Sequence, residues 1–313
     1  MVKIDLITGF LGSGKTTFIK KYAKYLMEQG LNICILENDY GAVNVDMMLL
    51  QDLAGDRCEL EMVAGGCDYD CHKRRFKTKL ISMGMCGYDR VIVEPSGIFD
   101  VDEFFDVLYE EPLDRWYEIG SVIAIVDAGM SNDMSKESDY LLASQLANAG
   151  AVVFSRSQNV SGADIDEKIA HINSAMELVG CKRRFKADND IINKDWDELT
   201  GADFERIMSC GYRQENYVKF LSGDDYGYSS LYFMNVKIPV AKLKDRAEKL
   251  LNDASCGKVF RIKGFMLKED GDWIELNATH DAVNIKPIET GQEVLIVIGE
   301  ELNEDNIKKY WNR

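Results

Sequence analysis

The chain has 313 residues, of which 46% are hydrophobic and 29% charged, a composition typical of a globular protein long enough for about two domains. The formal net charge of −16 argues against nucleic acid or an anionic membrane surface as a partner, because both would be repelled. No apolar run approaches the length of a membrane span, and the first residues show no signal-peptide pattern. We therefore expect a cytoplasmic protein whose eight cysteines are reduced.

Short apolar runs that alternate with helical patterns organise the first part of the chain. Continuous runs of this length suit strands that are buried on both faces, as in a parallel sheet. After the first run, Phe18, Tyr22 and Leu26 fall on one face of a predicted helix. The alternation predicts an α/β domain with a mostly parallel sheet, in which ligands bind beyond the carboxyl ends of the strands. The predicted strands are 2–8, 32–38, 89–97, 121–128 and 151–157.

The pattern changes after about residue 190. A polar stretch at 222–230 precedes a predicted strand at 231–240 and a predicted helix at 241–252. Strands with one helix between them favour a small α+β domain. Three more strands are predicted at 258–267, 272–276 and 293–299, followed by a helix that ends at Trp311. The expected organisation is an α/β domain at 1–210, a linker at 211–227 and an α+β domain at 228–313.

The segment GFLGSGKTT at 9–17 fits the P-loop pattern G-x-x-x-x-G-K-[ST]. Small residues let successive backbone N–H groups turn toward phosphates, Lys15 reaches the β- and γ-phosphates, and the Thr16 hydroxyl binds Mg²⁺. A strand is predicted to end at Thr8 and a helix to begin at Thr16, so the helix N-terminus points at the anion. The expected phosphate-binding residues are Gly9, Gly12, Ser13, Gly14, Lys15, Thr16 and Thr17.

Further segments resemble the CobW-like branch of the CobW/HypB/UreG family of P-loop GTPases, in the order that this family shows. The resemblance covers most of the chain and implies a CobW-type C-terminal domain after the P-loop domain. It implies a nucleotide hydrolase that delivers a metal to a client protein, such as a metalloenzyme or a cobalamin-related protein, or that assists cofactor assembly. The segments that carry it are LENDYGAVNVD at 36–46, VEPSG at 93–97, AIVDA at 124–128, VFRIKGF at 259–265 and VIGEELNEDNI at 297–307.

The resemblance also assigns roles around the phosphates. Behind the Mg²⁺ that Thr16 binds, a carboxylate of Glu94, Asp39 or Glu37 is expected. A backbone N–H near Gly97 would sense the γ-phosphate. Hydrolysis would then rest on positioning and on stabilisation of charge during in-line attack by water. The residues expected to act in catalysis are Lys15, Glu94 and Asp39.

The segment that reads the base departs from the family. Where the family has N-K-x-D, this chain has Ser155-Arg156-Ser157-Gln158. The neutral amide of Gln158 cannot supply the paired charge-assisted acceptors that a carboxylate offers to guanine, but an amide can pair with adenine. Arg156 can stack on a base through its planar guanidinium. The resemblance implies GTP, while the residues leave relaxed selectivity and a switch to ATP open.

The segment GGCDYDCH at 65–72 also departs from the family, which usually carries C-x-C-C there. Cys67 matches the first cysteine, and the next cysteine is Cys71, directly before His72. Two thiolates, with His72 or Asp70 as a further ligand and Glu37 at the end of the second predicted strand, are donors that Zn²⁺ or another transition metal accepts. Segments 37–46 and 67–76 would then change order with nucleotide state. Two structural cysteines remain as an alternative, because C-x3-C is not a common zinc spacing. A redox pair is the less favoured alternative, because C-x-x-C is absent.

Other candidates are weaker. Cys34 and Cys58 lie in apolar patterns that indicate a core, and Cys86 is a possible extra thiolate. The basic run HKRRFKTK at 72–79 indicates a solvated helix face, with docking of an acidic client as the less favoured interpretation.

These observations favour a P-loop NTP hydrolase that acts as a metallochaperone or cofactor-assembly factor. The alternative is a nucleotide-gated regulatory binding protein with little hydrolysis and no metal, which the altered base-reading and cysteine segments support. A small-molecule kinase would share the P-loop, but the sequence shows no motif for an acceptor site.

Overall fold

The chain folds into two compact units, Met1–Leu221 and Ser222–Arg313, which are described separately. The computed structural model describes residues 1–10, 12–39, 45–64, 69–97, 101–218, 228–234, 236, 238–268, 270–280, 282–288 and 293–311. Among these residues, no helix combines the length and the apolar character needed to cross a membrane.

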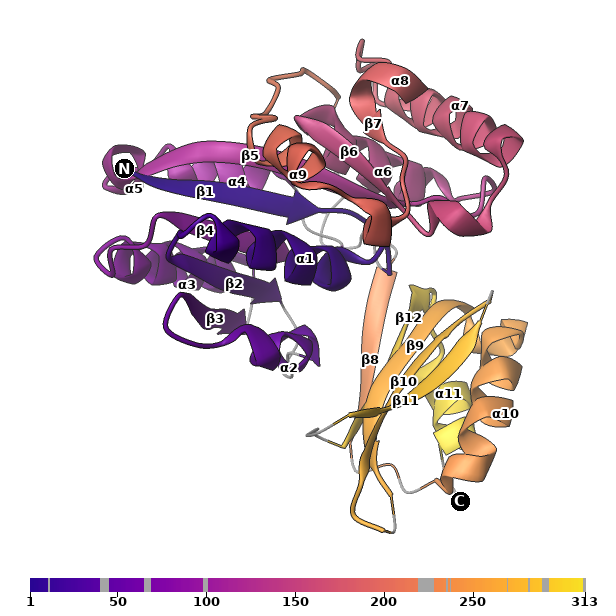
Figure 1. Ribbon diagram of the computed structural model, residues 1–313. Coiled ribbons are helices and arrows are strands. Elements are labelled where there is room, and N and C mark those ends of the chain that lie inside the picture. Colours follow the sequence, from indigo (N-terminus) through magenta and orange to yellow (C-terminus); the bar gives the residue numbers. More distant parts are fainter. Residues whose placement is uncertain are drawn as a thin grey trace. The chain divides into compact units, whose positions relative to one another are not determined.

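The first unit is built on a seven-stranded sheet whose paired strands all run parallel, which confirms the predicted α/β class (Figure 1). The strand order is β3-β2-β4-β1-β5-β6-β7. All residues of β4 and β6 are buried, as the continuous apolar runs predicted. Sequence analysis did not name β3 or the two-residue β7, which lie at the two edges of the sheet. The strands are β1 (Val2–Thr8), β2 (Ile33–Asp39), β3 (Cys58–Ala64), β4 (Arg90–Pro95), β5 (Tyr117–Asp127), β6 (Ala151–Ser155) and β7 (Ile191–Ile192).

Helices cover both faces of this sheet. Side chains of successive strand residues point to opposite faces, so Leu6 and Ile7 of β1 enter two different apolar cores. The core around Ile7 contains residues of α1 (Lys15–Glu28), α2 (Val45–Leu50) and α9 (Gly201–Met208). The core around Leu6 contains residues of α3 (Tyr69–Met83), α4 (Val101–Leu108), α5 (Leu113–Trp116), α6 (Lys136–Ala147) and α7 (Gly162–Leu178). One short helix, α8 (Ala187–Asp190), precedes β7.

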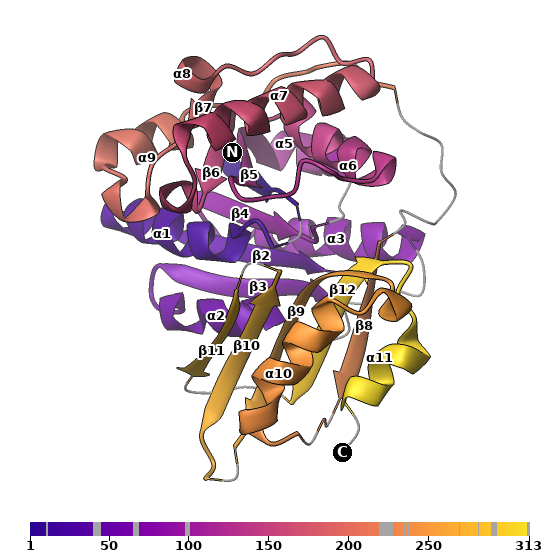
Figure 2. The same ribbon diagram turned by 90° about the vertical axis from the view of Figure 1, so that its right-hand side faces the viewer.

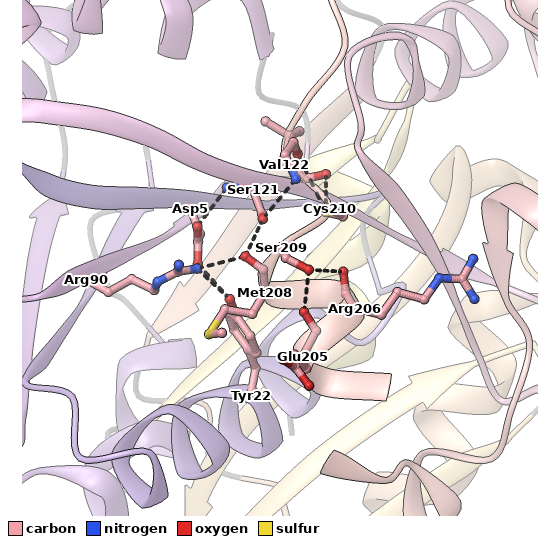
Figure 3. A network of polar contacts seen from close by, with 11 residues as sticks. Asp5, Tyr22, Arg90, Ser121, Val122, Glu205, Arg206, Met208, Ser209 and Cys210 are labelled. Carbon is pink, nitrogen blue, oxygen red and sulfur yellow. Dashed lines mark hydrogen bonds and ion pairs between the residues drawn. The ribbon is translucent and has the colours of Figure 1, made fainter. Parts of the chain in front are cut away.

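A buried polar network joins the sheet to α9 near the amino ends of β1 and β4 (Figure 3). The Asp5 carboxylate accepts hydrogen bonds from the Tyr22 hydroxyl at 2.8 Å and from Arg90 Nη1 at 2.7 Å. Arg90 Nη1 also donates to the Met208 carbonyl at 3.3 Å, and the Ser121 hydroxyl donates to the same oxygen at 2.9 Å. These bonds hold the last turn of α9 on the sheet and satisfy charges that burial would otherwise penalise.

The second unit is a five-stranded antiparallel sheet with helices α10 (Val240–Leu251) and α11 (Glu304–Trp311), as the α+β prediction required (Figure 2). Leu243 of α10 and Trp311 of α11 share one apolar core with Leu276 of the sheet. The predicted strands did not include β11, an edge strand that contains Pro287. The strand order is β11-β10-β9-β12-β8, with β8 (Tyr228–Met234), β9 (Lys258–Leu267), β10 (Trp273–Thr279), β11 (Val283–Ile288) and β12 (Val294–Glu300).

Candidate nucleotide-binding site

The P-loop connects β1 to α1 through a backbone that only glycine adopts readily. Gly9, Gly12 and Gly14 have φ values of 147°, 80° and 100°. A Cβ added to Gly9 would lie 2.3 Å from the Ile125 carbonyl oxygen, so the loop approaches β5 too closely for any other residue. Gly14 is the N-cap of α1, which begins at Lys15. The predicted order of strand, loop and helix is present, and Thr17 lies in the first turn of α1; Leu11 lies outside the described residues.

Two polar side chains of the P-loop are buried where phosphate would bind. Lys15 is buried and donates a hydrogen bond through Nζ to the Gly9 carbonyl at 3.1 Å. The Ser13 hydroxyl is also buried and finds no hydrogen-bond partner among the described residues. Burial of a hydroxyl without a partner costs free energy that an anionic ligand would recover. The loop therefore fits a phosphate group.

The Thr16 hydroxyl donates a hydrogen bond to Glu94 Oε1 at 3.0 Å. Glu94 is the buried residue before the last position of β4, and Glu37 stands opposite it in register on the neighbouring strand β2. A hydroxyl beside carboxylates supplies the oxygen ligands that Mg²⁺ prefers, so these side chains fit the cation that accompanies a triphosphate. Asp39 is the last residue of β2, and its side chain lies outside the described part of the chain.

Gly97 follows β4 and is held by α6. The side chain of Gln145 donates a hydrogen bond through Nε2 to the Gly97 carbonyl at 2.9 Å, and both partners are buried. This contact fixes the backbone three residues after Glu94. The role of Gly97 in sensing a γ-phosphate stays a prediction, and residues 98–100 lie outside the described part.

Arg156 lies directly after β6 and is tied to the P-loop. Its backbone is in the left-handed region, with φ 55°. Its guanidinium forms an ion pair with Asp127 at the end of β5 and donates through Nη2 to the Gly12 carbonyl at 3.1 Å. These contacts engage the edge of the guanidinium, so the predicted stacking on a base would use its face. Gln158 is exposed in the turn that follows.

Trp196 packs beside the P-loop and was not among the predicted site residues. Its indole N–H donates to the Phe154 carbonyl of β6 at 2.8 Å, and its ring stands edge to face with Phe18 of α1 at 5.5 Å. A Cβ on Gly14 would meet the indole at 3.1 Å. The sequence carried no signal for this role, because the two-residue strand β7 that precedes Trp196 was not predicted.

The described residues do not assemble the predicted metal site. Cys67 lies outside them, and Cys71 is half-buried in the first turn of α3. His72 is fully buried, with Nε2 2.8 Å from Asn38 Oδ1. Because neighbouring residues of β2 point to opposite faces, Asn38 holds His72 on the face opposite Glu37. Among the described residues, no three His, Cys, Asp or Glu side chains are grouped to hold an ion.

The weaker candidates from the sequence are three further cysteines and the basic run at 72–79. Cys34 and Cys58 are buried, and burial raises the pKa of the Cys58 thiol to about 11, which disfavours the thiolate that a metal needs. Cys86 is exposed. In the basic run of α3, Lys77 forms an ion pair with Glu110 at 2.6 Å and lowers the pKa of that carboxyl. Part of the positive charge of the basic run is therefore paired within the first unit.

Comparison with known proteins gives sequence matches to zinc chaperones. The chain is 28% identical over 182 residues to zinc chaperone YjiA of Escherichia coli, covering 55% of this chain and 55% of YjiA. It is 28% identical over 162 residues to zinc chaperone YeiR of the same organism, covering 51% of this chain and 48% of YeiR. The chain thus spans about half the length of these two curated relatives. Zinc-regulated GTPase metalloprotein activator 1 of Schizosaccharomyces pombe is 19% identical over 322 residues, covering 92% of this chain and 77% of that protein.

Among solved structures, Zn(II)-bound YjiA GTPase from Escherichia coli matches 100% of this chain and 99% of its own, with 19% identity and a TM-score of 0.37. A TM-score this low adds no support beyond the sequence match. The nucleotide-binding domain of CobW/HypB/UreG matches residues 3–179, which is more than half of the chain and includes the P-loop, Glu94 and Gly97. The chain belongs to the CobW/HypB/UreG family.

Proposed function

We propose that this protein binds and hydrolyses GTP and couples its nucleotide state to delivery of a metal ion to a client protein. The observation that carries the nucleotide part is the hydrogen bond between Thr16 and Glu94 beside the buried Lys15. Thr16 of α1 and Glu94 of β4 meet at the carboxyl ends of the strands, and Lys15 bonds the Gly9 carbonyl of the same loop. This is the edge where ligands bind in open α/β sheets.

In this proposal each group of the loop has one task. The backbone N–H groups from Gly12 to Thr17 surround the phosphates, and Lys15 exchanges the Gly9 carbonyl for a phosphate oxygen. Thr16 and Glu94 would hold Mg²⁺, which would supply positive charge beside the triphosphate. The protein then lowers the barrier mainly by positioning the triphosphate and by stabilising charge.

The choice of nucleotide depends on the segment after β6. Gln158 replaces the carboxylate that the family uses for guanine, so we expect weak discrimination between GTP and ATP. The proposal of GTP rests on family membership, since the CobW/HypB/UreG domain matches this part of the chain.

The metal part rests on the relatives named zinc chaperones and on the cysteine segment. Cys67, Cys71 and His72 remain the proposed donors, with Zn²⁺ as the proposed cargo. The contact of His72 with Asn38 means that the imidazole would have to bind through Nδ1 or turn away from β2.

A second candidate function is a nucleotide-gated regulatory protein without a metal. The placement of His72 and Glu37 on opposite faces of β2 favours it, because these two side chains do not converge. The two functions predict different effects of metal on hydrolysis.

Phosphate release separates them. Protein stripped of metal and protein loaded with one equivalent of Zn²⁺ are compared with GTP and with ATP, and Lys15→Ala serves as the inactive control. Phosphate release that needs Lys15 and changes with Zn²⁺ supports the metallochaperone. Nucleotide binding with phosphate release no faster than in Lys15→Ala would support the regulatory protein instead.

A further inference from the structure

The backbone that follows Glu94 is held from two sides. On one side, the Ser96 N–H donates a hydrogen bond to the Asn38 carbonyl of β2 at 2.9 Å. On the other side, Gln145 of α6 donates through Nε2 to the Gly97 carbonyl at 2.9 Å. A peptide unit is planar, so each of these bonds fixes the orientation of a whole unit. The unit between them, which carries the Gly97 N–H, is therefore left with little freedom to turn.

The Gly97 N–H is the donor that these two bonds leave available. Gly97 is a buried residue, and among the residues that the structure describes its N–H donates no hydrogen bond. Backbone N–H groups in protein interiors are nearly always paired, so this donor is open to an acceptor that the protein itself does not supply. It lies three residues after Glu94, whose carboxylate accepts a hydrogen bond from Thr16 at the P-loop. The terminal phosphate of a nucleotide bound there carries acceptor oxygens of the right charge.

The side chain of Gln145 makes its bond from an apolar environment. Gln145 is 1% exposed, and its neighbours one turn earlier on α6, Leu141 and Leu142, are buried to the same extent. Its Oε1 is buried and finds no hydrogen-bond partner among the described residues. A buried amide oxygen without a partner is unfavourable, so an apolar residue would suit the packing of α6 better. What the amide provides, and an apolar residue cannot, is the hydrogen bond to Gly97.

We propose that Gln145 is a positioning residue that holds the Gly97 N–H in place for the terminal phosphate of a bound nucleoside triphosphate. This inference rests on the proposed function. A diphosphate has no oxygen at this position, so the bond from Gln145 should favour binding of the triphosphate alone. A preorganised donor loses little freedom when it binds, and the charge of the phosphate strengthens the hydrogen bond. Gln145 would thus determine how well the protein distinguishes the nucleotide before hydrolysis from the product.

The test compares the Kd of a non-hydrolysable GTP analogue with the Kd of GDP, both measured by calorimetry with Mg²⁺ on the full chain. Gln145→Leu removes the donor and keeps a large buried side chain. We expect the Kd of the triphosphate analogue to rise about tenfold, because a hydrogen bond to a charged group is weakened. The Kd of GDP should change by less than about twofold. A merely structural role would change both values or neither.

Gln145→Glu gives a second test at the same position. An ionised carboxylate cannot donate to the Gly97 carbonyl, whereas a protonated carboxyl can. Burial disfavours the ionised form, so the introduced carboxyl should take up its proton at a higher pH than an exposed one. We expect the ratio of the two Kd values to return toward the wild-type ratio as the pH falls from about 9 to about 6. Wild type measured at each pH corrects for protonation of the nucleotide.

The matched control is Ser144→Ala, at the preceding residue of α6. Ser144 is also 1% exposed, and its hydroxyl donates to the Leu141 carbonyl at 2.8 Å. This variant removes a buried polar group from the same helix without removing the bond to Gly97, so both Kd values should stay as in the wild type. Circular dichroism confirms that each variant is folded. If Gln145→Leu does not fold, the pH dependence of Gln145→Glu decides alone.

Three results would overturn the inference. They are an equal change of both Kd values in Gln145→Leu, an unchanged Kd of the triphosphate analogue in that variant, and a ratio in Gln145→Glu that does not depend on pH. In each of these cases the wild type still binds nucleotide, and the proposed function stands. Wild-type protein that binds neither nucleotide would instead overturn the proposed function, and the role of Gln145 with it.

Discussion

Arg156 donates a hydrogen bond to the carbonyl of Gly12 at 3.1 Å, which links the end of β6 to the P-loop across 144 positions of the sequence. The same guanidinium pairs with Asp127. A charged donor at a loop carbonyl fixes the direction of the peptide units that follow, and these units carry the N–H groups for phosphate. Arg156 is therefore a positioning residue for the P-loop.

Removal of the hydrogen bond between Arg156 and Gly12 should weaken nucleotide binding to the same extent for every base. For Arg156→Ala we expect about a tenfold increase in Kd, because a hydrogen bond from a charged group contributes about 1.5 kcal/mol. GTP and ATP should be affected equally, as measured by competition with a fluorescent nucleotide. Arg156→Lys should recover part of the affinity. A loss confined to one nucleotide would show that the guanidinium stacks on the base instead.

Gln158 should determine how weakly the protein distinguishes the two bases. We expect the wild type to prefer GTP over ATP by less than about a hundredfold, since an amide lacks roughly 2–3 kcal/mol of charge-assisted bonding. Gln158→Asp should raise the preference for GTP about tenfold. Gln158→Asn, which keeps a neutral amide, is the control. Strong GTP preference in the wild type would mean that another residue reads guanine.

The contact between Thr16 and Glu94 predicts a split between binding and hydrolysis. Glu94→Gln keeps the size and an acceptor but removes the charge that stands behind Mg²⁺. We expect phosphate release to fall at least about a hundredfold while the Kd of the nucleotide changes by less than about tenfold. Lys15→Ala should instead abolish triphosphate binding. Calorimetry and a phosphate-release assay on both variants measure the two effects.

Local patterns made much of this site predictable. The P-loop is contiguous in sequence, and the strands that carry Thr8 and Glu94 are continuous apolar runs, so both followed from spacing and periodicity. The edge strand β3 was missed because Glu59 and Glu61 interrupt its apolar run. Buried strands give a stronger apolar signal than edge strands do.

Contacts between distant segments could not be predicted in the same way. Trp196 meets Gly14 only after β6 and β7 pair, and Arg156 reaches Gly12 only because of the left-handed turn after β6. The expected approach of Glu37 to His72 depends on strand alternation, which sends Glu37 and Asn38, the partner of His72, to opposite faces of β2. Local spacing in the sequence predicts which residues form the site. The order of the strands in the sheet then decides which of these residues come into contact.

The cysteine segment leads to a prediction about metal binding. We expect the wild type to take up one Zn²⁺, weakly without nucleotide and more tightly with a non-hydrolysable triphosphate, because coupled sites affect each other's affinity equally. The double variant Cys67→Ser/Cys71→Ser should lose this uptake. The measurement is a zinc titration against a chromophoric chelator, with and without the triphosphate. Cys34→Ser/Cys58→Ser is the control, since both of these thiols are buried in the sheet. Equal uptake by wild type and the first variant would show that Cys67 and Cys71 do not bind the ion.

The hydrogen bonds of Asp203 at the start of α9 predict that the stability of the folded protein depends on pH. Asp203 accepts hydrogen bonds from Lys194 Nζ at 2.8 Å and from the backbone N–H of Thr200 at 2.9 Å. The bond from Lys194, followed by the bond from Thr200, lowers the pKa of Asp203 from 3.8 to about 2. The ionised carboxylate is thus favoured in the folded state, and the stabilisation is complete above pH 3.8 and is lost as the pH falls toward 2.

Asp203→Asn should remove this contribution. We expect the variant to be less stable than the wild type at neutral pH, by about 1 kcal/mol or less because the site is close to solvent. The difference should shrink as the pH is lowered from about 4 to 2, because the wild type loses its charge there. Urea unfolding followed by circular dichroism at several pH values measures this difference. Asp166→Asn, an exposed substitution on α7, controls for the change in net charge. A constant difference across the pH range would mean that Asp203 stabilises α9 through its shape and neutral hydrogen bonds, and the ion pair with Lys194 would then contribute nothing measurable.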